Sequence, residues 1–110
     1  MISKDDAIID WNLSADTVHD RIRGLSPWPV ARTVFNGKIF KIYSSRVCEH
    51  YTSGEPGDVK TENGEIYVVC GGNTCLKLCE VQLEGSKRMN TVDFLRGRQF
   101  PQKYNFVKDN

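Results

Sequence analysis

Hydrophobic residues recur at helical spacing in one early segment of the chain. Val18, Ile22 and Leu25 lie at positions i, i+4 and i+7, while charged and polar residues occupy the other faces. Ser14 precedes this stripe as a good N-cap, and the glycine and proline that follow it stop the helix. The pattern therefore predicts a short amphipathic helix over residues 15–24.

After residue 29 the pattern becomes typical of β-structure. Asn-Gly pairs at 36–37 and 63–64 are strong hairpin signals, and they separate segments rich in β-branched and aromatic residues. Irregular alternation around Leu78 and Cys79 predicts a bulge in the longest strand. The predicted strands cover residues 33–35, 38 to about 51, 59–60, 65–70 and 74–83.

A second short helix is predicted near the C-terminus. Residues 91–96 follow the cap candidate Asn90 and end at Gly97, whereas residues 99–110 form a polar and aromatic tail without a clear period. We expect a mainly β fold: a small OB-like Greek-key barrel of five to six strands with an N-terminal helix and a short C-terminal helix. Closure of such a barrel removes exposed sheet edges. We expect residues 1–110 to form one domain, with a core over about 10–98.

Composition fits an ordinary globular domain. The chain has 110 residues, of which 39% are hydrophobic and 26% are charged. No apolar run approaches the ~20 residues of a membrane span, and the first residues lack the hydrophobic segment of a signal peptide. We expect a cytoplasmic protein without a membrane partner.

The four cysteines do not have the spacing of a zinc ribbon. Cys70, Cys75 and Cys79 fall in strand-like segments, where a reduced cysteine packs as a small hydrophobe. We expect neither a metal nor a cofactor. A metal site that combines Cys48 and His50 with the later cysteines is the alternative.

We find no pattern typical of a catalytic site. The chain contains neither a glycine-rich phosphate loop followed by a helix nor a nucleophile elbow. His19 lies on the polar face of the predicted helix and His50 lies near a strand end, so both are interpreted as surface or hydrogen-bonded histidines. No catalytic residue is predicted.

Basic residues suggest a binding role instead. The net charge is only +1, but residues 86–108 hold six Lys or Arg residues and a single acidic one. Cationic side chains on the short loops of a barrel can contact successive backbone phosphates. The candidate nucleic-acid-binding residues are Lys38, Lys41, Lys87, Arg88, Arg96 and Arg98.

Both tryptophans flank the first predicted helix. Trp11 precedes it and Trp28 follows it, held between Pro27 and Pro29, which stiffen the chain. Large rings on a rigid backbone serve either as core anchors or as a recognition surface. We interpret these four residues as structural.

Several of these segments together resemble one family. They are Ile-Asp-Trp-Asn-Leu-Ser-Ala-Asp at 9–16, Arg-Ile-Arg-Gly-Leu-Ser-Pro-Trp-Pro-Val-Ala at 21–31, Phe-Asn-Gly-Lys at 35–38, Leu-Cys-Glu-Val-Gln at 78–82, Glu-Gly-Ser-Lys-Arg-Met at 84–89 and Asp-Phe-Leu-Arg-Gly at 93–97. In this order they resemble the C-terminal domain of methionyl-tRNA formyltransferase. The resemblance covers nearly all of residues 3–98.

The resemblance implies a fold, a partner and a role. It implies an OB-like barrel appended to a Rossmann-type catalytic domain that carries 10-formyltetrahydrofolate chemistry. It further implies that Lys38, Lys41, Lys87 and Arg88 contact the phosphates of tRNA, and that the two tryptophans lock the helix to the barrel. The family's catalytic domain has no counterpart in these 110 residues, so we expect no formyl transfer by this chain alone.

The function expected from the resemblance is a non-catalytic accessory domain that binds tRNA. It would hold the backbone of initiator methionyl-tRNA beside a formyltransferase catalytic domain, supplied in cis or in trans. The chain is then either an excised domain or a freestanding relative. The alternative function is a structural or interaction module of a sugar-nucleotide or folate-dependent formyltransferase, without nucleic-acid binding.

Overall fold

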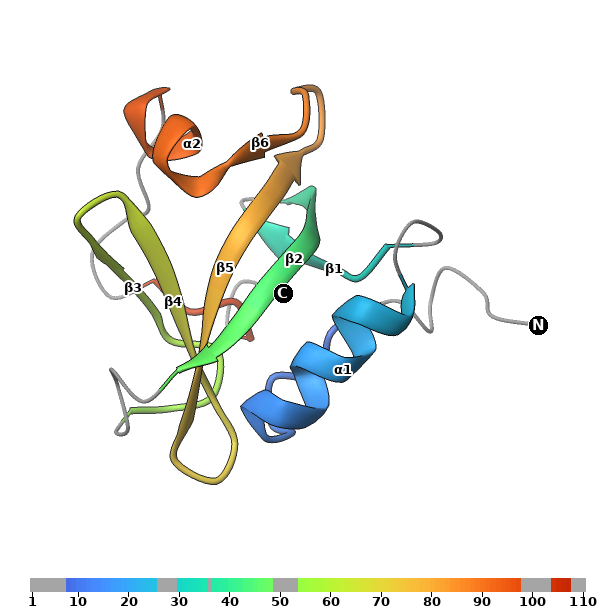
Figure 1. The fold of residues 1–110 in the computed structure, drawn as a ribbon, viewed down its shortest axis with the longest axis vertical. Helices are drawn as coiled ribbons and strands as arrows, with labels where there is room; N and C mark the ends of the chain where they lie inside the picture. Colours follow the sequence, from blue (N-terminus) through green and yellow to red (C-terminus); the bar gives the residue numbers. More distant parts are fainter. Residues whose placement is uncertain (1–7, 26–29, 36, 49–53, 98–103, 108–110) are drawn as a thin grey trace.

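A curved antiparallel sheet flanked by two helices makes up most of the fold (Figure 1). The computed structural model describes residues 8–25, 30–35, 37–48, 54–97 and 104–107. The predicted strand after the first turn ends at Cys48, and residues 49–51 lie outside the described part. The elements are α1 Ala15–Leu25, β1 Arg32–Phe35, β2 Lys38–Cys48, β3 Val59–Glu62, β4 Glu65–Cys70, β5 Thr74–Leu83, β6 Met89–Asn90 and α2 Thr91–Gly97.

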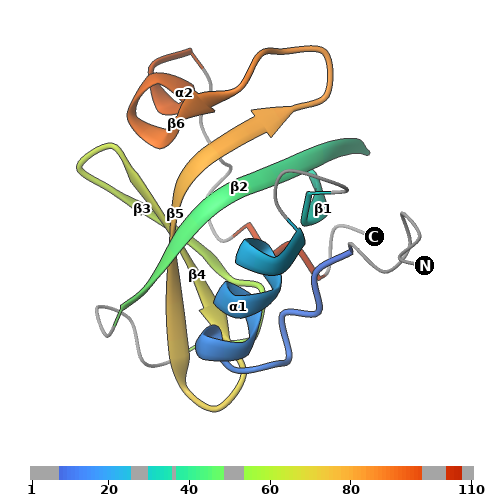
Figure 2. The ribbon, with the colours of Figure 1, turned by 45° about the vertical axis from the view of Figure 1, so that its right-hand side comes forward.

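The sheet has the strand order β1-β2-β5-β4-β3, and β6 pairs with β5. Strands β3, β4 and β5 form consecutive hairpins, and β2 lies beside β5, which is the arrangement of a Greek key. The long strands β2 and β5 run side by side across the molecule (Figure 2). The predicted mainly β fold with an N-terminal helix and a short C-terminal helix is confirmed.

The turn chemistry of the sequence produces the hairpins. Asn63 and Gly64 have φ angles of 52° and 79°, so both central residues of the β3–β4 turn are left-handed. Two such residues define a type I′ turn, whose twist matches that of the strands it joins.

The irregularity predicted near Leu78 and Cys79 is confirmed. Ser44 of β2 pairs with Glu80 and Ser45 pairs with Leu78, so Cys79 is skipped in the register. A second shift between Ile42 and Ser44 skips a residue of β2. Such bulges bend a strand and increase its twist, which lets β2 and β5 curve around the core.

Helix α1 packs its apolar stripe against β2. Val18, Ile22 and Leu25 are buried, and the helix extends one residue beyond the predicted end. The Ser14 hydroxyl accepts a hydrogen bond from the Thr17 amide at 3.4 Å, as expected of an N-cap. On the helix flank, His19 Nδ1 lies 2.8 Å from the hydroxyl of Ser45 on β2.

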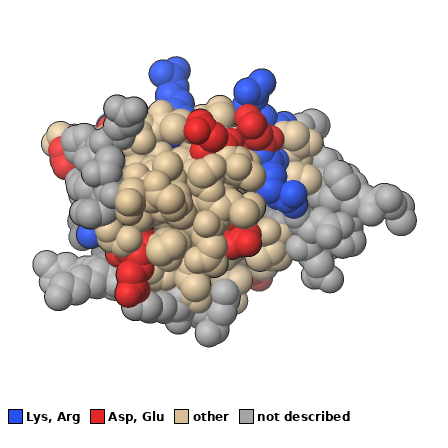
Figure 3. All heavy atoms as spheres, turned by 90° about the horizontal axis from the view of Figure 1, so that it is seen from below, with Lys and Arg blue, Asp and Glu red and all other residues tan. Residues whose placement is uncertain are grey.

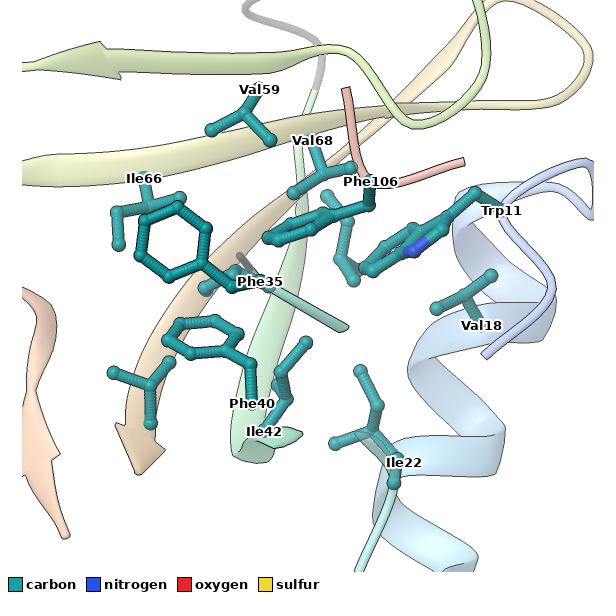
Figure 4. Close-up of a cluster of buried hydrophobic side chains, with 14 of the residues drawn as sticks. Trp11, Val18, Ile22, Phe35, Phe40, Ile42, Val59, Ile66, Val68 and Phe106 are labelled. Carbon is teal, nitrogen blue, oxygen red and sulfur yellow. The ribbon is translucent and has the colours of Figure 1, made fainter. Parts of the chain in front are cut away.

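Stacked aromatic side chains form the centre of the core (Figure 4). Trp11 is only 2% exposed, and its indole N–H lies 3.3 Å from the Thr33 hydroxyl oxygen that accepts its hydrogen bond. Its ring stacks on Phe106 with a centroid distance of 5.5 Å and an interplanar angle of 16°. Phe106 in turn stacks on Phe40 at 5.8 Å. Trp11 therefore acts as a core anchor.

The C-terminal segment at 104–107 closes one side of this core. The Val59 amide donates to the Tyr104 carbonyl at 2.9 Å, and the Phe106 amide donates to the Gly57 carbonyl at 2.9 Å. The Tyr104 hydroxyl donates to the carbonyl of Val34 on β1 at 3.4 Å. The segment thus connects β3 and β1, which stand at the two ends of the sheet order. The sequence pattern of the tail did not predict this contribution.

Gly71 joins the start of the β4–β5 turn to the chain that leads into α1. Its amide lies 3.1 Å from the Trp11 carbonyl oxygen and 2.9 Å from that of Leu13. A Cβ atom at this position would lie 1.8 Å from the Asn12 carbonyl oxygen, so only glycine fits.

Neither helix of the described residues is long and apolar enough to cross a membrane.

Candidate nucleic-acid interface

Basic side chains gather where β1, β2 and β5 lie side by side. Lys41 on β2 is the register partner of Arg32 on β1 and of Gln82 on β5. Register partners in an antiparallel sheet point to the same face, so these three side chains form one row across the sheet. The row is half-buried, away from the aromatic core.

Next to this row, Arg88 is held in a fixed position. Its guanidinium lies 4.2 Å from the centre of the Tyr43 ring, and it donates two hydrogen bonds of 3.1 Å to the carboxylate of Glu80. The Tyr43 hydroxyl donates to Gln82 Oε1 at 2.7 Å, which connects this group to the row. Glu80 compensates part of the Arg88 charge. The guanidinium therefore contributes oriented hydrogen-bond donors more than net positive charge.

Lys38 and Lys87 extend the basic surface at one end of the sheet. The two backbone segments that carry them are joined by Ile39 and Glu84: the Glu84 amide donates to the Ile39 carbonyl at 2.8 Å. The Ile39 amide in turn donates to Glu84 Oε1 at 2.9 Å. Both lysines are exposed, and neither forms an ion pair with another described residue.

A hollow of about 280 Å³ opens between these elements. Arg32 and Lys41 supply its positive charge. Gln82 also lines it, but its Nε2 donates to the Ser86 carbonyl at 2.9 Å and its Oε1 accepts from Tyr43. Glu84 also lines it; its Oε1 accepts the Ile39 amide, and its carboxylate offsets part of the positive charge. Two cations against one carboxylate leave the lining with a net positive charge, which attracts an anionic group such as a phosphate.

The other predicted cations lie elsewhere or outside the described residues. Arg96 on α2 pairs with Asp93 at 3.3 Å and lines a separate hollow of about 420 Å³ beside the β3–β4 turn. Figures 1 and 2 show α2 apart from β1. The structure thus brings Lys38, Lys41, Lys87 and Arg88 to one region and leaves Arg96 in another. Arg98, Pro27, Trp28 and Pro29 lie outside the described residues.

Arg32, and the neutral Gln82 in the same row, were not among the residues predicted from the sequence. A signal for Arg32 was present, because the Asn-Gly turn fixes the register of the first hairpin. Counting outward from Phe35 and Lys38 places Arg32 opposite Lys41. Gln82 had no comparable local signal, since its position depends on the long-range pairing of β2 with β5.

The end of the molecule opposite the basic surface differs from it in charge. Figure 3 shows it from below, on the side of the β4–β5 turn, and much of its described surface is uncharged. The acidic and basic side chains seen in that view lie mostly toward the edges of the uncharged area.

Within the described part of the chain, no three His, Cys, Asp or Glu side chains converge as metal ligands do. All four cysteines are free thiols, and Cys70 and Cys75 are buried among the strands. His50, which the alternative metal site required, lies outside the described residues.

The sequence matches the model of a known family. The family "Formyl transferase, C-terminal domain" matches residues 1–99. Among curated relatives, the methionyl-tRNA formyltransferase of Bacillus licheniformis is 42% identical over 97 residues, which cover 87% of this chain and 31% of that protein. That of Agathobacter rectalis is 45% identical over 97 residues, covering 88% of this chain and 31% of that protein. The chain thus spans about a third of the length of these relatives.

Solved structures show the same fold in a more distant protein. HypX from Aquifex aeolicus, in a crystal structure with tetrahydrofolic acid, matches with a TM-score of 0.69 and 15% sequence identity. The match covers 86% of this chain and 17% of HypX. At this identity the likeness concerns the fold alone.

Proposed function

We propose a function from one premise: the chain belongs to the family of formyl transferase C-terminal domains. We infer that it acts as the tRNA-binding accessory domain of a methionyl-tRNA formyltransferase-like protein. It holds the tRNA backbone while a separate catalytic domain, in cis or in trans, transfers the formyl group from 10-formyltetrahydrofolate. The chain itself performs no transfer step.

The observation that carries this proposal is the basic surface built from three strands and two connecting turns. Lys41 and Arg32 lie in one row, Lys38 and Lys87 extend it, and Arg88 is fixed above Tyr43. Phosphate contacts position a protein on nucleic acid without reading its sequence, and they come mainly from such Lys and Arg side chains. The surface therefore supports binding to a backbone.

The contacts available also limit the strength of binding. A few phosphate contacts release few counterions, so affinity is modest and falls with salt. The near-neutral charge of the whole chain, +1, adds no strong long-range attraction. We expect the domain to add to the affinity of a catalytic partner rather than to bind tRNA tightly alone.

A titration with tRNA at several salt concentrations tests the proposal. We expect binding at low salt, with a logarithmic dependence on salt whose slope reflects the number of phosphate contacts. Lys41→Ala should weaken binding and reduce the slope by about 1. Arg23→Ala, which removes an exposed cation from α1, is the matched control and should leave the slope unchanged.

Binding that is absent at low salt, or indifferent to salt, would overturn the proposal. If Lys41→Ala and the unmodified chain bind tRNA with equal affinity, the phosphate contact lies on another surface. Initiator and elongator tRNA should bind this domain alike, because backbone contacts carry no base information. Strong preference for one of them would contradict a backbone mode.

A further inference from the structure

Cys48 and Cys75 face each other across the pairing of β2 with β5. They are register partners at the end of this pairing, and their sulfur atoms lie 3.2 Å apart. Neither residue belongs to the basic surface, which lies toward the opposite end of β2.

The backbone geometry of the pair suits a disulfide. Directly opposed residues in antiparallel strands have Cα atoms about 4.5–5.5 Å apart. A disulfide accepts Cα separations of about 4.4–6.8 Å and joins its sulfur atoms at about 2.0 Å. The two sulfur atoms of Cys48 and Cys75 therefore need to approach by little more than an ångström, without a change of register.

The two thiols differ in access. Cys48 is partly exposed, whereas Cys75 is fully buried, so an external oxidant meets Cys48 first. The neighbouring pair on the same face of the sheet is Arg46 with Lys77, two residues along each strand.

Other groups on this face complete its surroundings. Lys77 forms an ion pair with Glu65 on β4. The Tyr67 hydroxyl donates to the same carboxylate at 2.7 Å, and this bond raises the pKa of Tyr67, which stays neutral. Arg46 makes no ion pair with a described residue.

The remaining cysteines lack this arrangement. Burial raises the pKa of Cys70 to about 12, and its thiol donates weakly to the Val68 carbonyl. Cys79 has no register partner on β2, and burial also raises its pKa. Both stay protonated at neutral pH and are poor nucleophiles.

We propose that Cys48 and Cys75 form a reversible intramolecular disulfide bond. The oxidant is a small-molecule disulfide such as glutathione disulfide. The Cys48 thiolate attacks one glutathione sulfur, forms a mixed disulfide and releases one glutathione thiolate. The Cys75 thiolate then attacks the Cys48 sulfur and releases the second glutathione. Two cysteines are oxidised, one glutathione disulfide is reduced to two glutathiones, and the two cysteine protons balance the two leaving thiolates. Excess glutathione reverses both steps.

The bond would tie β2 to β5 at the end remote from the basic surface. It joins positions 27 residues apart in the chain and so restricts the unfolded state. The register of the strands is unchanged, so the basic surface keeps its geometry. Oxidation should therefore raise the resistance of the domain to unfolding and leave its binding properties unaltered. This inference is independent of the proposed tRNA-binding function.

Mass spectrometry of the folded chain tests the proposal. After incubation with glutathione disulfide and acid quenching, the intact mass should fall by about 2 Da, as expected for the loss of two thiol hydrogens. Peptide mapping should locate the bond between Cys48 and Cys75. Cys75→Ser should stop at the mixed disulfide and retain one glutathione on Cys48, and Cys48→Ser should form no intramolecular bond. Cys79→Ser is the matched control and should oxidise like the unmodified chain.

Two results would overturn the proposal. The first is an unmodified chain that keeps four free thiols at a glutathione disulfide excess that oxidises a reference dithiol. The second is a bond that involves Cys70 or Cys79. Mapping of the unmodified chain decides between these outcomes even where a serine variant folds poorly. A circular dichroism spectrum unchanged by oxidation would confirm that the bond forms within the native sheet.

Discussion

Replacing Gly71 with alanine perturbs the point where the β4–β5 turn meets the chain before α1. The new Cβ atom would lie 1.8 Å from the carbonyl oxygen of Asn12 and 2.6 Å from its carbonyl carbon. Both partners are backbone atoms, so a rotamer change cannot relieve the overlap. The two segments must separate by more than an ångström before ordinary contact distances return.

The expected loss of stability follows from this separation. Overpacking of a tight contact costs about 1–3 kcal/mol. Separation also weakens the bonds from the Gly71 amide to the carbonyls of Trp11 and Leu13, and a lost hydrogen bond costs about 1 kcal/mol. We expect Gly71→Ala to lower the free energy of unfolding by about 2–4 kcal/mol, a large part of the total for a domain of this size.

Urea unfolding followed by far-ultraviolet circular dichroism measures this change. Gly24→Ala is the matched control, because a Cβ at Gly24 in α1 would meet nothing within 4 Å. Alanine in a helix is more stable than glycine by about 0.5–1 kcal/mol, so this control should shift the midpoint upward. A Gly71→Ala variant with an unchanged midpoint would refute the close approach of Asn12 to the turn.

Three further predictions concern the core, the pH dependence and a helix cap. Phe106→Ala should lower the free energy of unfolding by about 3–5 kcal/mol, whereas Val107→Ala, at an exposed side chain, should change it by less than about 0.5 kcal/mol in the same urea titration. Burial raises the pKa of Cys70 from 9.0 to about 12, so its contribution to stability is fully present below pH 9 and is lost as pH rises toward 12. Between pH 9 and 12 the free energy of unfolding should fall less steeply with pH for Cys70→Ala than for the unmodified chain. Identical slopes would contradict the raised pKa of Cys70. Asn90→Ala removes the bond of 2.8 Å from the Asp93 amide to Asn90 Oδ1, and thermal unfolding should show a loss of about 1 kcal/mol that Asn90→Ser restores.

Local signals in the sequence predicted the elements of this fold well. The stripe of Val18, Ile22 and Leu25 predicted α1, and the Asn63–Gly64 pair predicted a turn that the φ angles confirm. These signals act between near neighbours, where spacing and turn chemistry determine the conformation. The contribution of Tyr104 and Phe106 escaped this reasoning, because the segment has no periodicity and its burial depends on distant partners.

The candidate site, too, could be predicted only where local pairing places its residues. Lys38 and Lys41 could be placed near each other because one tight turn fixes their hairpin. The pairing of Arg88 with Glu80 and its position over Tyr43 depend on the way β6 returns beside β5, which no local pattern specifies. Charge counted along the chain therefore overstates the free positive charge of the surface.

The stack of Trp11 on Phe106 has a consequence for the rates of folding and unfolding. The two rings come from nearly opposite ends of the chain, so closing this contact requires almost the whole chain to form one loop. Contacts of such long range form late in folding, after local hairpins such as β3–β4. A stabilising contact that forms late acts mainly by slowing unfolding. The aromatic stack is therefore expected to determine how long the folded domain persists, while the turns and hairpins determine how fast it forms.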